Sequence, residues 1–111
     1  MKRVVVILAS IFILAFAVHA SAGTVMDSIQ KSGVLRVGTT AGQAPMTAMT
    51  KSGEVIGLDA DLARAMAASL DVKVKCVVLP FKELIPALEA GKVDMILSGM
   101  TITPKRNQKV A

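Results

Sequence analysis

The spacing of hydrophobic and polar residues changes along this chain between two patterns, one typical of strands and one typical of helices. Short runs rich in β-branched residues, typical of strands, occur at residues 34–39, 72–79 and 93–97. Between them, apolar residues recur every three or four positions, as in helices packed on one face. The predicted order is helix, strand, hairpin, helix, strand, helix, strand and the start of a further helix.

The predicted helices are bounded by residues that begin or end helices. Thr24 is expected to cap a helix over residues 25–31, which Gly33 ends, and Asp59 is expected to cap the next helix. The apolar stripe of that second helix comprises Leu62, Ala63, Met66, Ala67 and Leu70. Residues 81–90 predict a third helix, and residues 46–56 predict a hairpin that turns at residues 51–53.

This order predicts an α/β fold, a βαβαβ lobe built on a parallel sheet. The carboxyl ends of parallel strands meet at one edge of a sheet, where ligands bind in open α/β folds. Three segments should converge there: residues 39–46, the turn around Phe81, and residues 98–106. We therefore expect a binding site at this edge.

Residues 98–106 are the strongest candidate for ligand contact. Thr103 followed by Pro104 is typical of a helix start, where unpaired N–H groups favour an anion. Arg106 adds a planar fork of donors suited to a carboxylate. The alternative interpretation is structural, because such turns are common in α/β proteins and an Arg in a first helical turn is usually solvated.

The first 22 residues are typical of a secretory signal peptide. Lys2 and Arg3 precede an apolar run over residues 4–18, and small residues follow at Ala20, Ser21 and Ala22. Cleavage after Ala20 and cleavage after Ala22 both fit this pattern, and residues 23–111 would then form the mature lobe. The alternative is an uncleaved membrane anchor, for which a run of this length is short.

Composition excludes several classes of function. Without Lys2 and Arg3 the 13 basic residues become 11, against 8 acidic ones, and no basic cluster with interleaved aromatic residues predicts nucleic-acid binding. Cys76 is the single cysteine and lies in an apolar run, so we expect a small buried side chain. His19 would be lost with the signal peptide. We therefore predict no catalytic residue, no metal site and no cofactor.

Four segments in this order and spacing resemble one family. They are residues 35–39 (LRVGT), 57–63 (GLDADLA), 84–94 (LIPALEAGKVD) and 98–106 (SGMTITPKR). Together they resemble the N-terminal lobe of the bacterial periplasmic solute-binding proteins of the polar amino-acid type, family 3, which serve ABC importers. The resemblance implies a periplasmic protein with two lobes that close on a ligand. It also implies a monomer that binds an amino acid or similar polar carboxylate and delivers it to a permease.

The resemblance also implies roles for individual residues. Arg106 matches the arginine that holds the ligand's α-carboxylate, assisted by Ser98 and Thr101, with Gly99 lending its backbone N–H. Phe81 matches the position that packs on the ligand's side chain. Gln43 stands where the family usually has an aromatic residue, and this departure indicates a different or less apolar ligand side chain.

Length is the larger departure from the family pattern. Family members continue into a second lobe, whereas this sequence stops at Ala111, so we expect a truncated lobe that binds amino acids weakly or not at all. Two other functions fit the same features. One is a periplasmic dehydratase acting on cyclic carboxylic acids, since related folds include such enzymes. The other is a membrane-tethered sensor that keeps its N-terminal segment.

Overall fold

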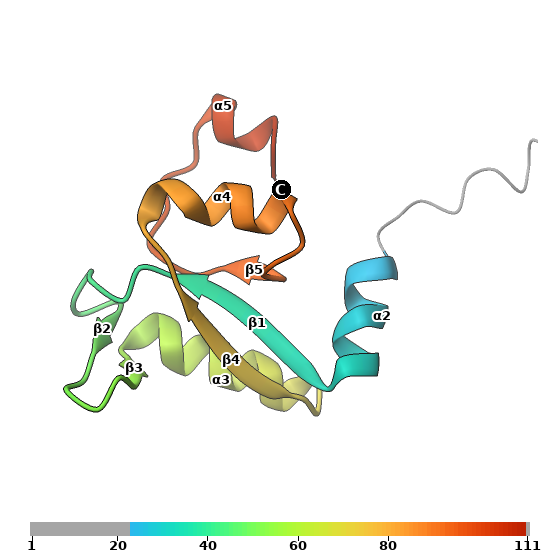
Figure 1. Cartoon of the computed structure of the whole chain (residues 1–111), viewed down its shortest axis with the longest axis horizontal. Coiled ribbons are helices and arrows are strands. Elements are labelled where there is room, and N and C mark those ends of the chain that lie inside the picture. The colour runs from blue at the N-terminus through green and yellow to red at the C-terminus, as the bar shows by residue number, and fades with distance from the viewer. Residues whose placement is uncertain (1–22, 111) are drawn as a thin grey trace, which may run out of the picture.

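A three-stranded parallel sheet is the centre of the fold. The computed structural model describes residues 23–110, so the predicted signal peptide lies outside the described residues. The strands are β1 (Val34–Thr39), β4 (Lys73–Val78) and β5 (Met95–Ile96), in the order β4-β1-β5 (Figure 1). β1 pairs with β4 over six positions and with β5 over two. The predicted α/β fold with a parallel sheet is confirmed.

Helices cover both faces of this sheet, and a small hairpin lies beside it (Figure 1). The remaining elements are α2 (Gly23–Ser32), the hairpin strands β2 (Ala48–Met49) and β3 (Val55–Ile56), α3 (Leu58–Ser69), α4 (Phe81–Glu89) and α5 (Pro104–Asn107). In the part of the chain that the structure describes, none of these helices is long and apolar enough to cross a membrane.

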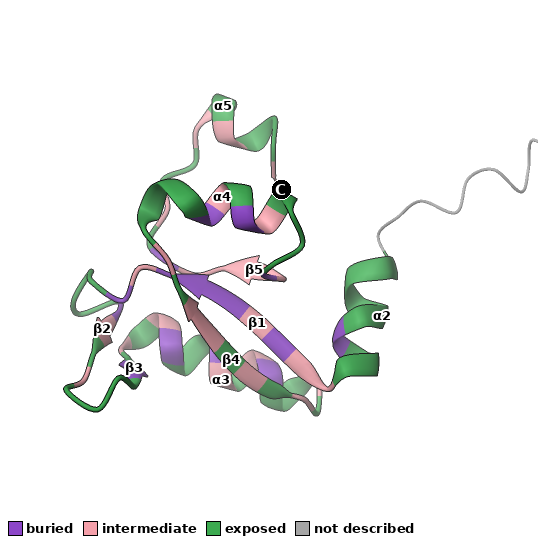
Figure 2. Cartoon of the chain, viewed as in Figure 1, coloured by how far each residue is buried: buried purple, intermediate pink, exposed green. Residues whose placement is uncertain are grey.

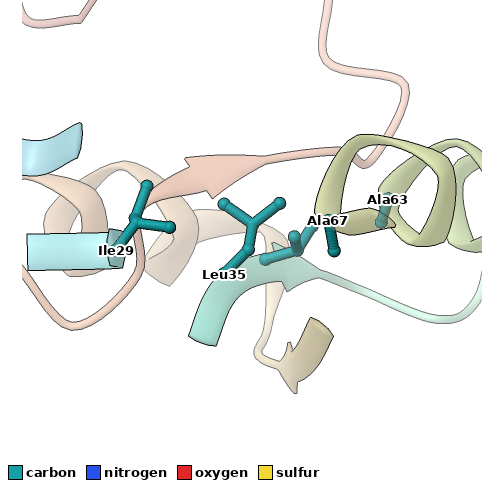
Figure 3. Close-up of a cluster of buried hydrophobic side chains, with 5 residues drawn as sticks. Ile29, Leu35, Ala63 and Ala67 are labelled. Atoms are coloured by element: carbon teal, nitrogen blue, oxygen red, sulfur yellow. The ribbon is translucent and has the colours of Figure 1, made fainter. Parts of the chain in front are cut away.

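Successive side chains of β1 point to opposite faces of the sheet. Leu35 and Val37 are buried in a cluster with Ile29 of α2 and with Ala63 and Ala67 of α3 (Figure 3). On the opposite face, a methyl group at Gly38 would lie 3.3 Å from Leu84 of α4 and 3.4 Å from Val93. The missing side chain at Gly38 therefore lets α4 pack closely on the strand that leads to the predicted site.

The buried face of α3 is made of alanines and differs from the predicted stripe. Ala60, Ala63 and Ala67 are buried, whereas Leu62 is 47% exposed. Figure 2 shows buried, intermediate and exposed stretches alternating along α3. Small side chains at these three positions let the helix approach β1 and β4 closely. Leu62 lies about 100° around the helix from Ala63 and faces solvent, so its assignment to the core was wrong.

The start of α3 also differs from the prediction, because Gly57 and not Asp59 is the N-cap residue. The first helical N–H groups bond to carbonyls of the preceding loop: Leu58 N–H donates to Pro45 O at 3.4 Å and Asp59 N–H to Met46 O at 2.9 Å. These loop carbonyls accept the N–H groups that a side-chain cap was expected to bond. The predicted strands at residues 72–79 and 93–97 are likewise shorter in the structure.

Gly57 should be intolerant of substitution. Its φ of 114° is a conformation that favours glycine, and an added Cβ would lie 2.4 Å from Met46 O. We expect Gly57→Ala to lower the free energy of unfolding by about 3 kcal/mol or more in urea denaturation. Gly53→Ala is the matched control, because φ is also positive there (85°) but no atom lies within 4 Å. It should cost about 1 kcal/mol, and equal losses would exclude the steric explanation.

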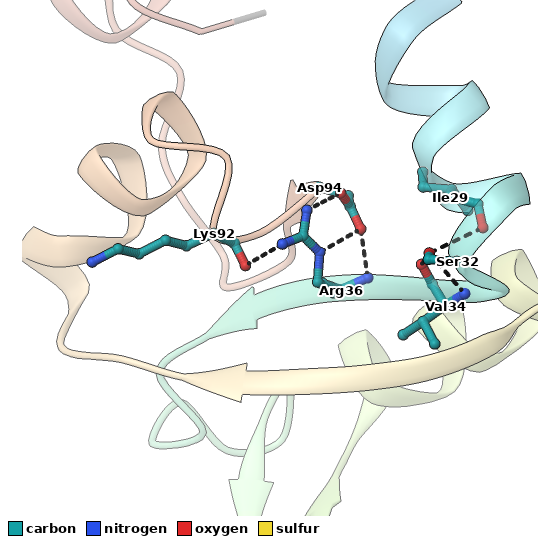
Figure 4. Close-up of polar contacts among 6 residues, drawn as sticks. All are labelled: Ile29, Ser32, Val34, Arg36, Lys92 and Asp94. Carbon is teal, nitrogen blue, oxygen red and sulfur yellow. Dashed lines mark hydrogen bonds and ion pairs between the residues drawn. The ribbon is translucent and has the colours of Figure 1, made fainter.

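An ion pair joins the beginning of β5 to β1 (Figure 4). Arg36 Nη2 and Nε donate to the two carboxylate oxygens of Asp94 at 2.7 and 3.2 Å, and the Arg36 backbone N–H donates to Asp94 Oδ2 at 2.8 Å. Arg36 Nη1 also donates to Lys92 O at 3.1 Å. The Asp94 side chain is only 5% exposed. These bonds fix the segment that carries the chain into the predicted site.

Candidate ligand-binding site

The carboxyl ends of the three strands lie side by side, as predicted. Beyond the last paired residues, Leu79 N–H donates to Thr39 O at 2.9 Å and Leu97 N–H donates to Gly38 O at 3.0 Å. The segments that follow β1, β4 and β5 therefore leave the sheet at one edge. Two groups of predicted ligand-binding residues form at this edge, one around Ser98 and one around Arg106.

The first group joins Ser98 to the loop after β1. Ser98 is buried, and its Oγ accepts the Thr40 backbone N–H at 3.1 Å and lies 3.0 Å from Thr40 Oγ1. Ser98 Oγ in turn donates to Gln43 Oε1 at 3.4 Å. Because a hydroxyl has one proton, the Thr40 hydroxyl is then the donor to Ser98. The hydrogen bonds run in one direction, from Thr40 through Ser98 to Gln43.

The loop after β1 brings Gln43 back toward this group. Ala41 adopts a positive φ of 54°, and the Gln43 N–H donates to Thr47 O at 2.9 Å, which closes a tight turn. On the other side, Gly99 has a φ of 57°, and a Cβ there would lie 3.3 Å from Gln43 Oε1. Glycine at position 99 therefore leaves room for the Gln43 amide. The Gly99 backbone N–H has no partner among residues 23–110.

The second group holds Arg106 from two sides. Arg106 Nη1 donates to Thr101 O at 2.7 Å, and the guanidinium carbon lies 5.2 Å from the centre of the Phe81 ring. The ring face attracts the cation and limits its rotation. Within residues 23–110, the Nε and Nη2 groups of Arg106 make no hydrogen bond, so two donors of its fork are free for a ligand.

The helix start in this segment is as predicted, although its contribution is small. Thr103 is the N-cap of α5, and its Oγ1 accepts the Arg106 backbone N–H at 3.2 Å. α5 is a single turn of four residues, so its dipole adds little. Any attraction for an anion at this place therefore rests on the Arg106 side chain.

The predicted residues do not enclose a single pocket. A groove of about 320 Å³ between α4, β5 and α5 includes Thr101 and Arg106 on its wall. Ser98, Gln43 and Phe81 do not line it. Arg106 and Thr101 are therefore the predicted ligand-binding residues that reach this groove.

Sequence reasoning missed Thr40, which belongs to the first group. Its position directly after β1 was the available signal, because residues that follow parallel strands reach the same edge.

Cys76 is half-buried, and burial, only partly offset by the charge of Arg64, raises the pKa of its thiol. No cluster of potential metal ligands occurs among the described residues.

The chain belongs to the bacterial extracellular solute-binding proteins, family 3, whose family model matches residues 35–111. It is 35% identical to the histidine-binding periplasmic protein of Escherichia coli K12 over 111 residues, which is 100% of this chain and 40% of that protein. It therefore spans about 40% of the length of this relative. Other relatives are periplasmic amino-acid-binding proteins as well, so the predicted family is confirmed.

Solved structures give the same fold. An ancestral cationic amino acid solute-binding protein, AncCDT-1, has a TM-score of 0.72 and 48% identity, covering 75% of this chain and 36% of that one. The arginine-bound form of domain 1 from TmArgBP has a TM-score of 0.71 and 41% identity, covering 74% of this chain and 65% of that one. The described lobe is thus part of the periplasmic-binding-protein fold.

Enzymes also occur among the similar proteins. The membrane-bound lytic murein transglycosylase F of Aliivibrio fischeri is 40% identical over 93 residues, covering 83% of this chain and 18% of that enzyme. An ancestral cyclohexadienyl dehydratase has a TM-score of 0.72 and 36% identity, covering 85% of this chain and 38% of that one. Most of these relatives are binding proteins, which favours binding over catalysis.

Proposed function

We propose that this chain is the substrate-binding component of an ABC importer for amino acids or similar polar solutes, or a part of that component. In this proposal residues 1–22 are a cleaved signal peptide, and residues 23–111 form a periplasmic lobe. The lobe acts as a monomer and passes its ligand to an inner-membrane permease. Family membership and the periplasmic amino-acid-binding relatives support this assignment.

The geometry of Arg106 carries the proposal. Thr101 O and the Phe81 ring orient the guanidinium, so less freedom is lost when a ligand binds. Its free Nε and Nη2 groups suit a bidentate bond to an α-carboxylate. The Gly99 N–H and the exposed Thr101 hydroxyl are further donors for the same carboxylate, while the buried Ser98 acts through Thr40 and Gln43. Phe81 can contact the ligand only with the part of its ring that Arg106 leaves open.

A dehydratase is less favoured. Such an enzyme needs a positioned general acid or base beside its substrate. The two groups at the sheet edge consist of hydroxyls, an amide, an aromatic ring and a guanidinium, and they include no carboxylate, imidazole or thiol that could serve as this acid or base. The similarity to an ancestral cyclohexadienyl dehydratase is therefore not matched by a catalytic pair among these residues.

Binding of amino acids by the whole chain tests the proposed function. In a ¹⁵N NMR titration, L-amino acids should shift the amide signals of Gly99, Thr101 and Arg106 with saturation. A single exposed ion pair contributes little, so we expect affinity weaker than micromolar. The arginine-bound form of domain 1 from TmArgBP supports binding to one lobe. Micromolar binding would correct only the expected strength, whereas no saturable shift at millimolar ligand would exclude ligand binding by this chain on its own.

A further inference from the structure

The polar side chains at the sheet edge contain no carboxylate. The set comprises Thr40, Gln43, Ser98, Thr101 and Arg106. Arg106 is its one charged member, and its charge is positive. A ligand's second polar group would therefore meet no negative partner among these five residues.

The orientation of the Gln43 amide decides which of its two polar atoms a ligand would meet. Its Oε1 is occupied by the Ser98 hydroxyl at 3.4 Å, so its acceptor side faces the protein. The amide nitrogen Nε2 has no partner within residues 23–110, and Gln43 is exposed. Because the two atoms lie on opposite sides of the amide carbon, the NH₂ group faces solvent at the edge where the ligand is proposed to bind. Gly99 supports this orientation, since a larger residue would crowd Oε1.

From this geometry we infer that Gln43 selects ligands whose distal group accepts hydrogen bonds. The inference rests on the proposed function and narrows its substrate class to carboxylates with an acidic or amide side chain. A cationic distal group would be repelled by Arg106 and would meet the Gln43 NH₂ donors in place of a carboxylate partner. This preference differs from the cationic ligands in the names of several similar proteins.

Gln43→Glu is the sharpest test of this inference. The substitution keeps the shape of the side chain and an oxygen that accepts the Ser98 proton, but it replaces the outward NH₂ with a carboxylate oxygen. The probes are L-glutamate, L-glutamine, L-arginine and L-lysine, titrated into the whole chain and followed by the same amide signals. The wild-type chain should bind glutamate and glutamine about three- to fivefold more tightly than arginine and lysine. Gln43→Glu should reverse that order.

Two further variants separate the possible outcomes. Gln43→Met removes the donors without adding charge, so glutamate and glutamine should weaken while arginine stays unchanged. Glu83→Gln tests the acidic residue nearest to Phe81 in the first turn of α4, and it should leave every affinity unchanged. Tighter binding of arginine by the wild-type chain, or an unchanged order in Gln43→Glu, would overturn the inference and leave the proposed function standing. If the chain bound none of the four probes, both the inference and ligand binding by this chain would be overturned.

Discussion

Arg106→Met should reduce the affinity for every amino acid that the chain binds by about tenfold or more. An exposed ion pair contributes about 1 kcal/mol, and the free Nε and Nη2 groups of Arg106 allow the stronger bidentate form of such a pair with one carboxylate. Methionine keeps the unbranched stem and removes both donors. The measurement is the dissociation constant from NMR titration, compared with that of the wild-type chain.

The matched control is Lys105→Met, which removes the same charge from the neighbouring exposed residue. Its affinity should stay within about twofold of wild type, because an exposed charge without a direct contact is strongly screened. Equal losses in the two variants would mean that the ligand responds only to net charge. Wild-type affinity in Arg106→Met would remove Arg106 from the site.

Asp94→Asn should destabilise the lobe by about 2 kcal/mol at neutral pH. Asp94 accepts three hydrogen bonds from Arg36, two from the guanidinium and one from the backbone N–H, and its side chain is buried. Asparagine keeps one acceptor oxygen and leaves the cation of Arg36 without its partner. The measurement is urea denaturation. Asp61→Asn is the control, because the exposed Asp61–Arg64 pair at 3.0 Å should contribute about 0.5 kcal/mol or less.

The same pair predicts how stability changes in acid. Burial raises the pKa of Asp94, but the hydrogen bonds and the charge of Arg36 together outweigh it, so the pKa lies below its ordinary value. A carboxyl with a lowered pKa stabilises the fold fully above its unfolded pKa of about 3.9 and loses this contribution as pH falls through the folded pKa. The wild-type chain should therefore lose more stability than Asp94→Asn between pH 5 and about pH 2. Parallel pH profiles would contradict this assignment.

The sequence pattern predicted the sheet well because strand and helix periods are local properties. The predicted strand at residues 34–39 matches β1, and the hairpin, the parallel order and the Thr103 cap are also as expected. The errors arose where tertiary contacts decide. Loop carbonyls of Pro45 and Met46 replaced the expected Asp59 cap, and alanines replaced Leu62 on the buried face of α3.

For the candidate site, the pattern identified the edge and most of its residues, but not how they interact. Nothing in the sequence indicates that the Phe81 ring lies against Arg106, or that Thr40 and Gln43 share Ser98. These contacts join residues more than 20 positions apart, and their geometry depends on strand register and on the turn at Ala41. The direction of the hydrogen bonds, and hence the outward Gln43 amide, follows only from the folded arrangement.

The unequal pairing of β1 with its two neighbours should also affect the rates of backbone amide exchange. Its two-residue contact with β5 can open locally by breaking few hydrogen bonds, whereas its six-residue contact with β4 opens only with much of the sheet. Backbone amides next to Ser98, such as that of Leu97, should therefore exchange with deuterium faster than amides between β1 and β4. A ligand that binds only the closed form slows that exchange in proportion to its occupancy. Amide exchange at the shortest strand of the sheet would thus report the fraction of chains that carry a ligand at this edge.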